Sequence, residues 1–224
     1  MYKICQSFAS TSYEIGRIRA FSPGWLENES IWVHMGYKYL LALLESGSYD
    51  VFFRDFHTMA IPFLNAESYG RSTTENSSFI ASSAATDMGI HGRGYVARLS
   101  GSTAEFISIW QQMLFGKKPF RLTEGQLELS LQPAIPSYLI PEDGTLSAMF
   151  LGVTKLTYHL SGVTHLIPEH YHITRYSLQY ADGAKEQFEY ERLPGVVARR
   201  VRAGDVKELH VWIKGKGFNE SYSN

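Results

Sequence analysis

The sequence is poor in cysteine and has no excess of charge of either sign. Its 224 residues include one cysteine, Cys5, and 21 lysines and arginines stand against 22 aspartates and glutamates. A single cysteine excludes a disulfide framework and a zinc site built on several cysteines. A formal net charge of −1 provides no overall field to attract nucleic acid or an anionic membrane. We therefore expect no metal, no nucleic-acid partner and no membrane partner.

Long apolar runs and targeting patterns are also missing. No stretch approaches the roughly 20 consecutive apolar residues of a membrane-spanning helix. Residues 1–20 have neither the apolar core of a secretory signal nor an arginine-rich amphipathic pattern. Aromatic residues, in contrast, make up 14% of the chain, which is typical of a folded protein. The sequence predicts a globular, cytoplasmic protein.

Helical periodicity dominates the first half of the chain. Apolar side chains recur at spacings of three and four, as Met35 and Tyr39 do in the first helix. Ser102 and Glu105 have the spacing of a capping box, and Gly116 is a typical stop. Four helices are predicted, over residues 31–45, 49–59, 77–85 and 102–115.

From residue 122 the pattern changes to strands separated by turns rich in Gly, Asp and Pro. Alternating apolar and polar residues predict half-buried strands. The basic cluster at residues 199–202 is interpreted as a solvated strand edge, with nucleic-acid or membrane contact as the alternative. Strands are predicted over residues 126–132, 147–151, 153–159, 172–180, 187–192 and 209–213.

The two patterns predict an α+β chain with a helical part over residues 1–121 and an antiparallel β-sandwich or jelly roll over residues 122–224. Four helices cannot bury all their apolar faces against one another. We expect these faces to be covered by another chain, such as a second copy, or by a missing N-terminal part of the same protein. The second arrangement is favoured.

Two segments carry side chains suited to binding. The loop before the first helix contains Trp25 and Glu27, and His34 follows it; these are side chains used for stacking on sugars, binding hydroxyls and contacting anions. The alternative is a surface turn with a helix cap. Ser100 and Gly101 lie at the mouth of the fourth helix, where free backbone N–H groups attract anions. The alternative there is a helix cap with no further role.

Four separated motifs together resemble the C-terminal part of glycoside hydrolase family 94, the inverting cellobiose- and chitobiose-type phosphorylases. The resemblance is strongest over residues 21–136 and covers the motifs in the family's order. The motifs are Pro23-Gly24-Trp25-Leu26-Glu27-Asn28 through His34, Arg71-Ser72-Thr73-Thr74-Glu75-Asn76, His91-Gly92-Arg93-Gly94, and Ser100-Gly101-Ser102. A further phrase, Leu131-Gln132-Pro133-Ala134-Ile135-Pro136, resembles the family's first strand after its helical barrel.

The resemblance implies a fold and a site. The chain would hold the last third of an (α/α)6 barrel and the C-terminal jelly roll. His34, Ser100 and Gly101 match phosphate contacts, and serine keeps the hydroxyl of the family's threonine. Glu27 matches the glutamate that binds the acceptor sugar. Candidate substrate contacts from the same motifs are Trp25, Arg93 and Glu75, the last with helix capping as its alternative.

The family's general acid, an aspartate in a Trp-Asn-Asp type motif, has no counterpart in this sequence. Phosphorolysis requires an acid that protonates the glycosidic oxygen while phosphate attacks the anomeric carbon. The chain alone is therefore expected to be inactive. The resemblance implies a parent enzyme that cleaves a β-linked disaccharide or oligoglucan with inorganic phosphate as co-substrate and no other cofactor. The alternatives are a non-catalytic carbohydrate-binding or oligomerisation module and part of an inverting hydrolase on the same barrel.

Overall fold

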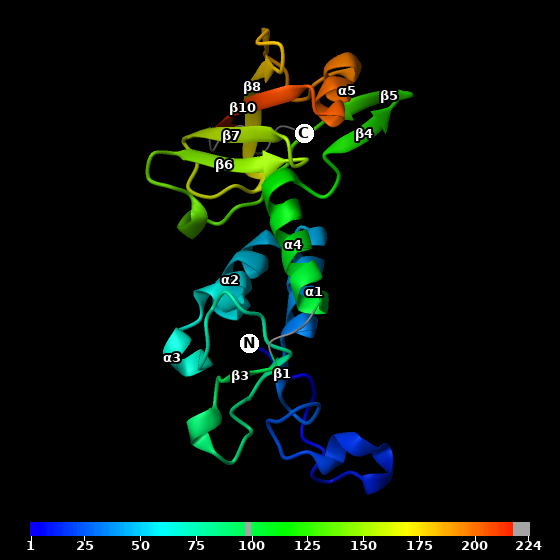
Figure 1. Cartoon of the computed structure of the whole chain (residues 1–224), viewed down its shortest axis with the longest axis vertical. Helices are drawn as coiled ribbons and strands as arrows, with labels where there is room; N and C mark the ends of the chain where they lie inside the picture. The colour runs from blue at the N-terminus through cyan, green and yellow to red at the C-terminus, as the bar shows by residue number, and fades with distance from the viewer. Residues whose placement is uncertain (97–99, 217–224) are drawn as a thin grey trace. The chain divides into compact units, whose positions relative to one another are not determined.

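The computed structural model describes residues 1–96 and 100–216, and it divides the chain into two compact units, Met1–Trp110 and Gln111–Asn224. The predicted boundary lay later, between residues 121 and 122. Helices and several sheets are both present, which confirms the α+β class (Figure 1). No barrel is formed by the described residues. None of the described helices is both long and apolar enough to cross a bilayer.

The first unit is built on helices that bury aromatic faces. Tyr37 of α1 stacks on Phe106 of α4 at 5.4 Å between ring centroids, and Phe56 of α2 meets Trp110 of α4 edge-on at 6.0 Å. Burying such rings provides most of the stabilisation of a helical core. The helices are α1 (Val33–Glu45), α2 (Tyr49–Met59), α3 (Ala66–Tyr69) and α4 (Ser100–Phe115), the last continuing into the second unit.

Two of the predicted inward positions of the first helix are wrong. Met35 and Tyr39 are 48% and 37% exposed, whereas Tyr37, which lies between them in the sequence, is buried. The buried stripe is therefore shifted partly round the helix from the predicted one. Both stripes have helical spacing in the sequence, so periodicity alone could not choose between them.

The predicted helix over residues 77–85 is not formed. This segment contains β2 (Phe79–Ile80), which pairs on one side with β1 (Ile31–Trp32) and on the other with β3 (Gly94–Tyr95). Three of the serines expected to form a small helix surface, Ser77, Ser78 and Ser82, are buried, and Ser78 donates its backbone N–H to the carbonyl of Tyr95 at 2.9 Å. Tertiary pairing overrides the local preference.

The second unit contains a five-stranded sheet with the order β6-β7-β10-β8-β9. Its strands are β6 (Thr145–Phe150), β7 (Thr154–Ser161), β8 (Tyr171–Tyr180), β9 (Lys185–Phe188) and β10 (Val206–Gly215), and a separate hairpin is formed by β4 (Phe120–Thr123) and β5 (Gln126–Leu129). The β-rich character is confirmed. The prediction of a wholly antiparallel arrangement is wrong, because β10 runs parallel to β7.

Residues 199–202, interpreted from the sequence as a strand edge, belong instead to α5 (Gly195–Ala203). Val197, Ala198 and Val201 of this helix are buried, while its arginines alternate with them around the helix. Apolar residues at spacings of three and four are the signature of a half-buried helix. This helix covers β5, so the second unit is not purely β.

Candidate functional site

The loop that carries Trp25 and Glu27 is held against the segment at residues 81–85. Ser82 donates its backbone N–H to the carbonyl of Gly24 at 3.2 Å and its hydroxyl to the carbonyl of Glu29 at 2.5 Å. Gly24 has a φ of +79°, and a Cβ there would lie 2.4 Å from the backbone nitrogen of Ala85. Only glycine fits this close backbone approach. The Pro-Gly turn is thus fixed by its neighbours.

The motif at residues 91–94 joins the same cluster of loops. A ring nitrogen of His91 lies 2.7 Å from the carbonyl oxygen of Ala85, and Gly92 donates its N–H to the carbonyl of Ala81 at 2.9 Å. Two motifs that are about 60 residues apart in the sequence therefore meet through residues 81–85. The structure brings together the predicted loops at 22–30 and 91–94.

His34 is the second residue of α1 and faces the beginning of α4. Its Nε2 lies 3.6 Å from Oε1 of Glu105, and the two side chains are 34% and 21% exposed. Glu105 is little more than one helical turn beyond the first residues of α4, Ser100 and Gly101. The surroundings of these two residues lie outside the described part of the chain. The predicted approach of His34 to Ser100 stays a prediction.

Trp25 and Glu27 are both half-buried, and each contacts other side chains of the first unit. The Trp25 ring packs edge-on against Phe79 and Tyr95, at 5.0 and 4.4 Å between centroids. Glu27 forms an ion pair with Arg17 through Oε1. Its Oε2 is buried and has no hydrogen-bond partner among the described residues. A carboxylate oxygen in that state is available to a donor on a ligand.

Glu75 and Arg93 are exposed. The backbone carbonyl of Glu75 accepts a hydrogen bond from the Tyr69 hydroxyl at 2.8 Å, but no described partner fixes its carboxylate. The Arg93 side chain runs alongside Gly70, where an added Cβ would lie 3.4 Å from its Cγ. Both residues border the loops described above, and neither forms an ion pair with another described residue.

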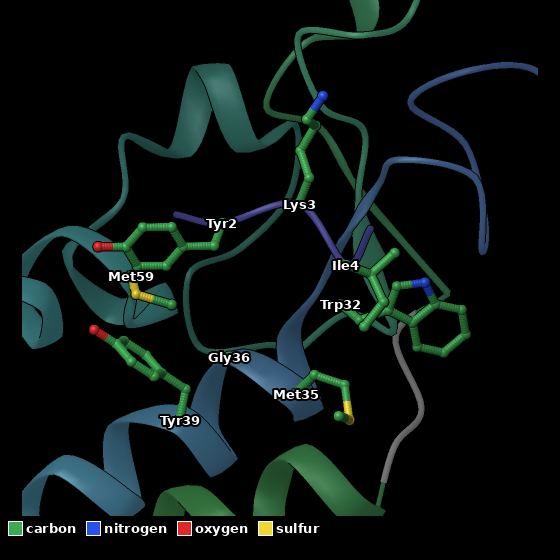
Figure 2. A pocket seen from close by; sticks show the side chains of 8 residues that line it. All are labelled: Tyr2, Lys3, Ile4, Trp32, Met35, Gly36, Tyr39 and Met59. Carbon is green, nitrogen blue, oxygen red and sulfur yellow. The ribbon is translucent and has the colours of Figure 1, made fainter. Parts of the chain in front are cut away.

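A pocket of about 390 Å³ lies elsewhere in the first unit and includes none of the predicted residues. Figure 2 shows Met35 and Tyr39 of α1 facing Tyr2 and Ile4 of the N-terminal segment across it. Its size is in the range of small-molecule pockets, and its walls are largely apolar. The pocket was not predicted from the sequence, because residues 1–20 have no periodic pattern. The surplus of apolar residues on α1 was the one sequence feature that could have indicated it.

Two tyrosines that line this pocket, Tyr2 and Tyr39, donate hydrogen bonds to a buried carboxylate. Asp55, which is 4% exposed, accepts hydrogen bonds from the Tyr39 hydroxyl at 2.8 Å, the Tyr2 hydroxyl at 3.2 Å and Nε of Arg54 at 2.8 Å. Burial pushes the pKa of the Asp55 carboxyl upward, but these three donors outweigh it and leave the pKa below its ordinary value. The bond to Asp55 raises the pKa of Tyr39 to about 12.

No model of a known protein family matches the chain, and no curated protein matches its sequence. Among the described residues, no group of three or more His, Cys, Asp and Glu is placed to hold a metal ion.

Proposed function

We propose that this chain supplies the phosphate and acceptor-sugar contacts of an inverting carbohydrate phosphorylase, as the C-terminal part of an (α/α)6 barrel followed by a β-rich unit. The observation that carries the proposal is the meeting of separated motifs in one unit. The loop with Glu27 and the loop with His91 are joined through residues 81–85, and His34 lies beside Glu105 near the beginning of α4. These motifs are the ones on which the resemblance to family 94 rests.

The chemistry assigns roles to these residues. Phosphate attacks the anomeric carbon of a β-linked disaccharide or oligoglucan while an acid protonates the departing glycosidic oxygen, which gives a sugar 1-phosphate with inversion. His34 donates a ring N–H to phosphate, and the first backbone N–H groups of α4, with the Ser100 hydroxyl, complete the cradle. Glu27 accepts hydroxyl hydrogen bonds from the acceptor sugar, with Trp25, Glu75 and Arg93 bordering it.

The general acid must come from polypeptide outside these 224 residues, because no Trp-Asn-Asp type motif occurs here. The exposed side of α1 suits such an addition. Met35, Tyr39 and Ile4 are large apolar residues that line an open pocket rather than a core. Further helices packed there would bury them. The single cysteine, Cys5, is compatible with the reducing cytoplasm, where we place the activity.

Binding of inorganic phosphate to the 224-residue chain tests the proposal. Isothermal titration calorimetry should detect millimolar or tighter binding, and His34→Ala should weaken it about tenfold or more, the usual worth of a charge-assisted hydrogen bond. His170→Ala is the matched control, because His170 is an exposed histidine of the second unit. Equal binding by the wild type and His34→Ala would contradict the phosphate site.

A second experiment separates the phosphorylase from a hydrolase built on the same barrel. The chain is combined with the polypeptide that carries the acid, and sugar release from cellobiose is followed with and without phosphate. Release that depends on phosphate and yields a sugar 1-phosphate supports the proposal. Release at the same rate in phosphate-free buffer would identify a hydrolase.

A further inference from the structure

The five-stranded sheet of the second unit has one buried face and one open face. In β10, Leu209, Val211 and Ile213 are buried, while Glu208, His210 and Trp212 between them are only partly covered. Alternate residues of a strand point to opposite faces, and directly paired residues share a face. The pairing register continues this side of β10 onto β7 and β6 in one direction and onto β8 and β9 in the other, and Figure 1 shows β6, β7 and β10 side by side. We call it the open face.

Positive charge is concentrated on the open face, although the chain as a whole carries a net charge of −1. Lys155 is paired with Glu208, Lys185 with Gln179, Arg175 with Trp212, and Lys214 with Ser161. These four basic residues share the face with one acidic residue, Glu208. Such a local excess of one sign attracts a ligand of the opposite charge.

A row of stacked side chains makes the middle of the open face rigid. The Arg175 guanidinium lies 3.8 Å from the centre of the Trp212 ring, and the His159 ring stacks on Trp212 at 4.6 Å with an interplanar angle of 13°. Arg175 and His159 belong to the strands on the two sides of β10, so they cover both faces of the indole. Nε2 of His159 lies 3.0 Å from Nδ1 of His210.

The stacking decides which kind of anionic polymer fits. Single-stranded nucleic acids are held by bases stacking on open aromatic faces, and Trp212 has none to offer. Between the charges lie the neutral polar side chains of Ser147, Ser177 and Gln187. Ser177 and Gln187 are directly paired, and the hydroxyl of the exposed Ser147 lies 2.9 Å from that of Thr157, which is buried. These groups exchange hydrogen bonds with the hydroxyls of a sugar chain. Strand spacing repeats them at regular intervals, as a polymer requires.

We propose that the open face binds an anionic glycan, a sugar polymer carrying carboxylate, phosphate or sulfate groups. The basic side chains hold its charges, and the hydroxyl and amide groups between them hold its hydroxyls. This surface lies wholly in the second unit and does not depend on the phosphorylase proposal. It would retain the chain on a charged polysaccharide without any cleavage.

Affinity measurements on the full 224-residue chain test the proposal, with oligogalacturonate as the carboxylated probe and a neutral malto-oligosaccharide of equal length as its control. At 50 mM salt we expect oligogalacturonate to bind and the neutral probe not to bind, with affinity falling steeply as salt is raised. The double variant Lys155→Glu/Lys214→Glu should lose at least about tenfold in affinity. Lys118→Glu, a charge reversal outside the five-stranded sheet, should change affinity by less than about twofold.

Lys155 and Lys214 are exposed, so reversing them should not prevent folding, and a circular dichroism spectrum checks this. The separate variant Lys185→Glu tests the same face from another strand. No binding of oligogalacturonate by the wild-type chain would overturn the proposal, and so would binding that the reversals leave unchanged. Tighter binding of oligouridylate, also lost in the double variant, would overturn it in favour of a nucleic acid.

Discussion

At the scale of single residues, Asp55 has the clearest energetic role. Three donors converge on this buried carboxylate, so Asp55→Asn removes the charged acceptor from all three and, because an amide NH2 cannot accept, leaves at least one of them with no acceptor. We expect a loss of about 1–3 kcal/mol in the free energy of unfolding at pH 7, measured by urea denaturation. Tyr39→Phe removes only one of the hydrogen bonds and should cost less. An unchanged stability in Asp55→Asn would contradict this account.

The same carboxylate predicts a dependence of stability on pH. The pKa of Asp55 is lower in the folded chain than its ordinary value of 3.8, because the three hydrogen bonds outweigh the opposing effect of burial. The stability that it contributes is fully present above the ordinary pKa and is lost as the pH falls through the lower folded value. Between pH 5 and pH 2, the free energy of unfolding should therefore fall less steeply with pH in Asp55→Asn than in the wild type.

Two glycines should respond to alanine with opposite signs. A Cβ at Gly94 would lie 2.2 Å from the Tyr69 ring and 2.7 Å from Oγ of Ser77, both buried, so Gly94→Ala should destabilise the first unit by about 1–3 kcal/mol. A Cβ at Gly36, inside α1, meets only the flexible end of Met59 at 3.3 Å. Gly36→Ala should be neutral or stabilising by up to about 1 kcal/mol. Thermal unfolding of both variants provides the comparison.

At the scale of elements, local patterns predicted most of what they could specify. The helix over residues 49–59 and the strands at β7, β8 and β10 have clear periods, and the structure contains them. The predictions of a helix over residues 77–85 and of a strand edge at residues 199–202 were wrong, each for its own reason. Ser78 and Phe79 are extended because β1 and β3 flank them, and that pairing is not visible locally. The four-residue cluster Arg199-Arg200-Val201-Arg202 is too short for its pattern to distinguish a helix from a strand.

The candidate site was predictable to the same extent. The motifs predict roles for Glu27, His34 and His91, but they do not predict that residues 81–85 join the loops of Glu27 and His91 through backbone hydrogen bonds. Backbone carbonyls are present at every residue, so the sequence contains no sign of which ones will be used. The pocket beside α1 could not be predicted for a related reason: it depends on where the N-terminal segment lies against the helix.

The row of rings across β7, β10 and β8 gives the sheet its own dependence on pH. Burial lowers the pKa of His159, and the neighbouring His210 and Arg175 lower it further. The unfolded chain therefore binds this proton more readily, and stability falls as the pH drops from above 6.5 through the folded pKa. His159→Gln should lessen the fall in stability between pH 7.5 and pH 5. An equal fall in both proteins would show that His159 does not carry it.

At the scale of the whole molecule, the chain contains only some of the groups that the proposed reaction requires. In the proposed function His34 and Glu27 would contact phosphate and an acceptor sugar, while the acid that phosphorolysis requires has no counterpart in the sequence. Removing a general acid from such a reaction costs about 10²–10⁴-fold or more in rate. The chain should therefore bind phosphate without catalysing phosphorolysis.

We expect the purified 224-residue chain to bind phosphate and yet form no sugar 1-phosphate from cellobiose and phosphate, as measured by a coupled assay over many hours. Adding the polypeptide that carries the acid should restore turnover, and the His34→Ala variant should restore less of it at low phosphate than at saturating phosphate, because the substitution weakens phosphate binding. His170→Ala should behave as the wild type does. Turnover by the purified chain alone would show that the acid lies within it, and the search for that group would then begin at the buried, unpaired Oε2 of Glu27, which lies among the motif loops.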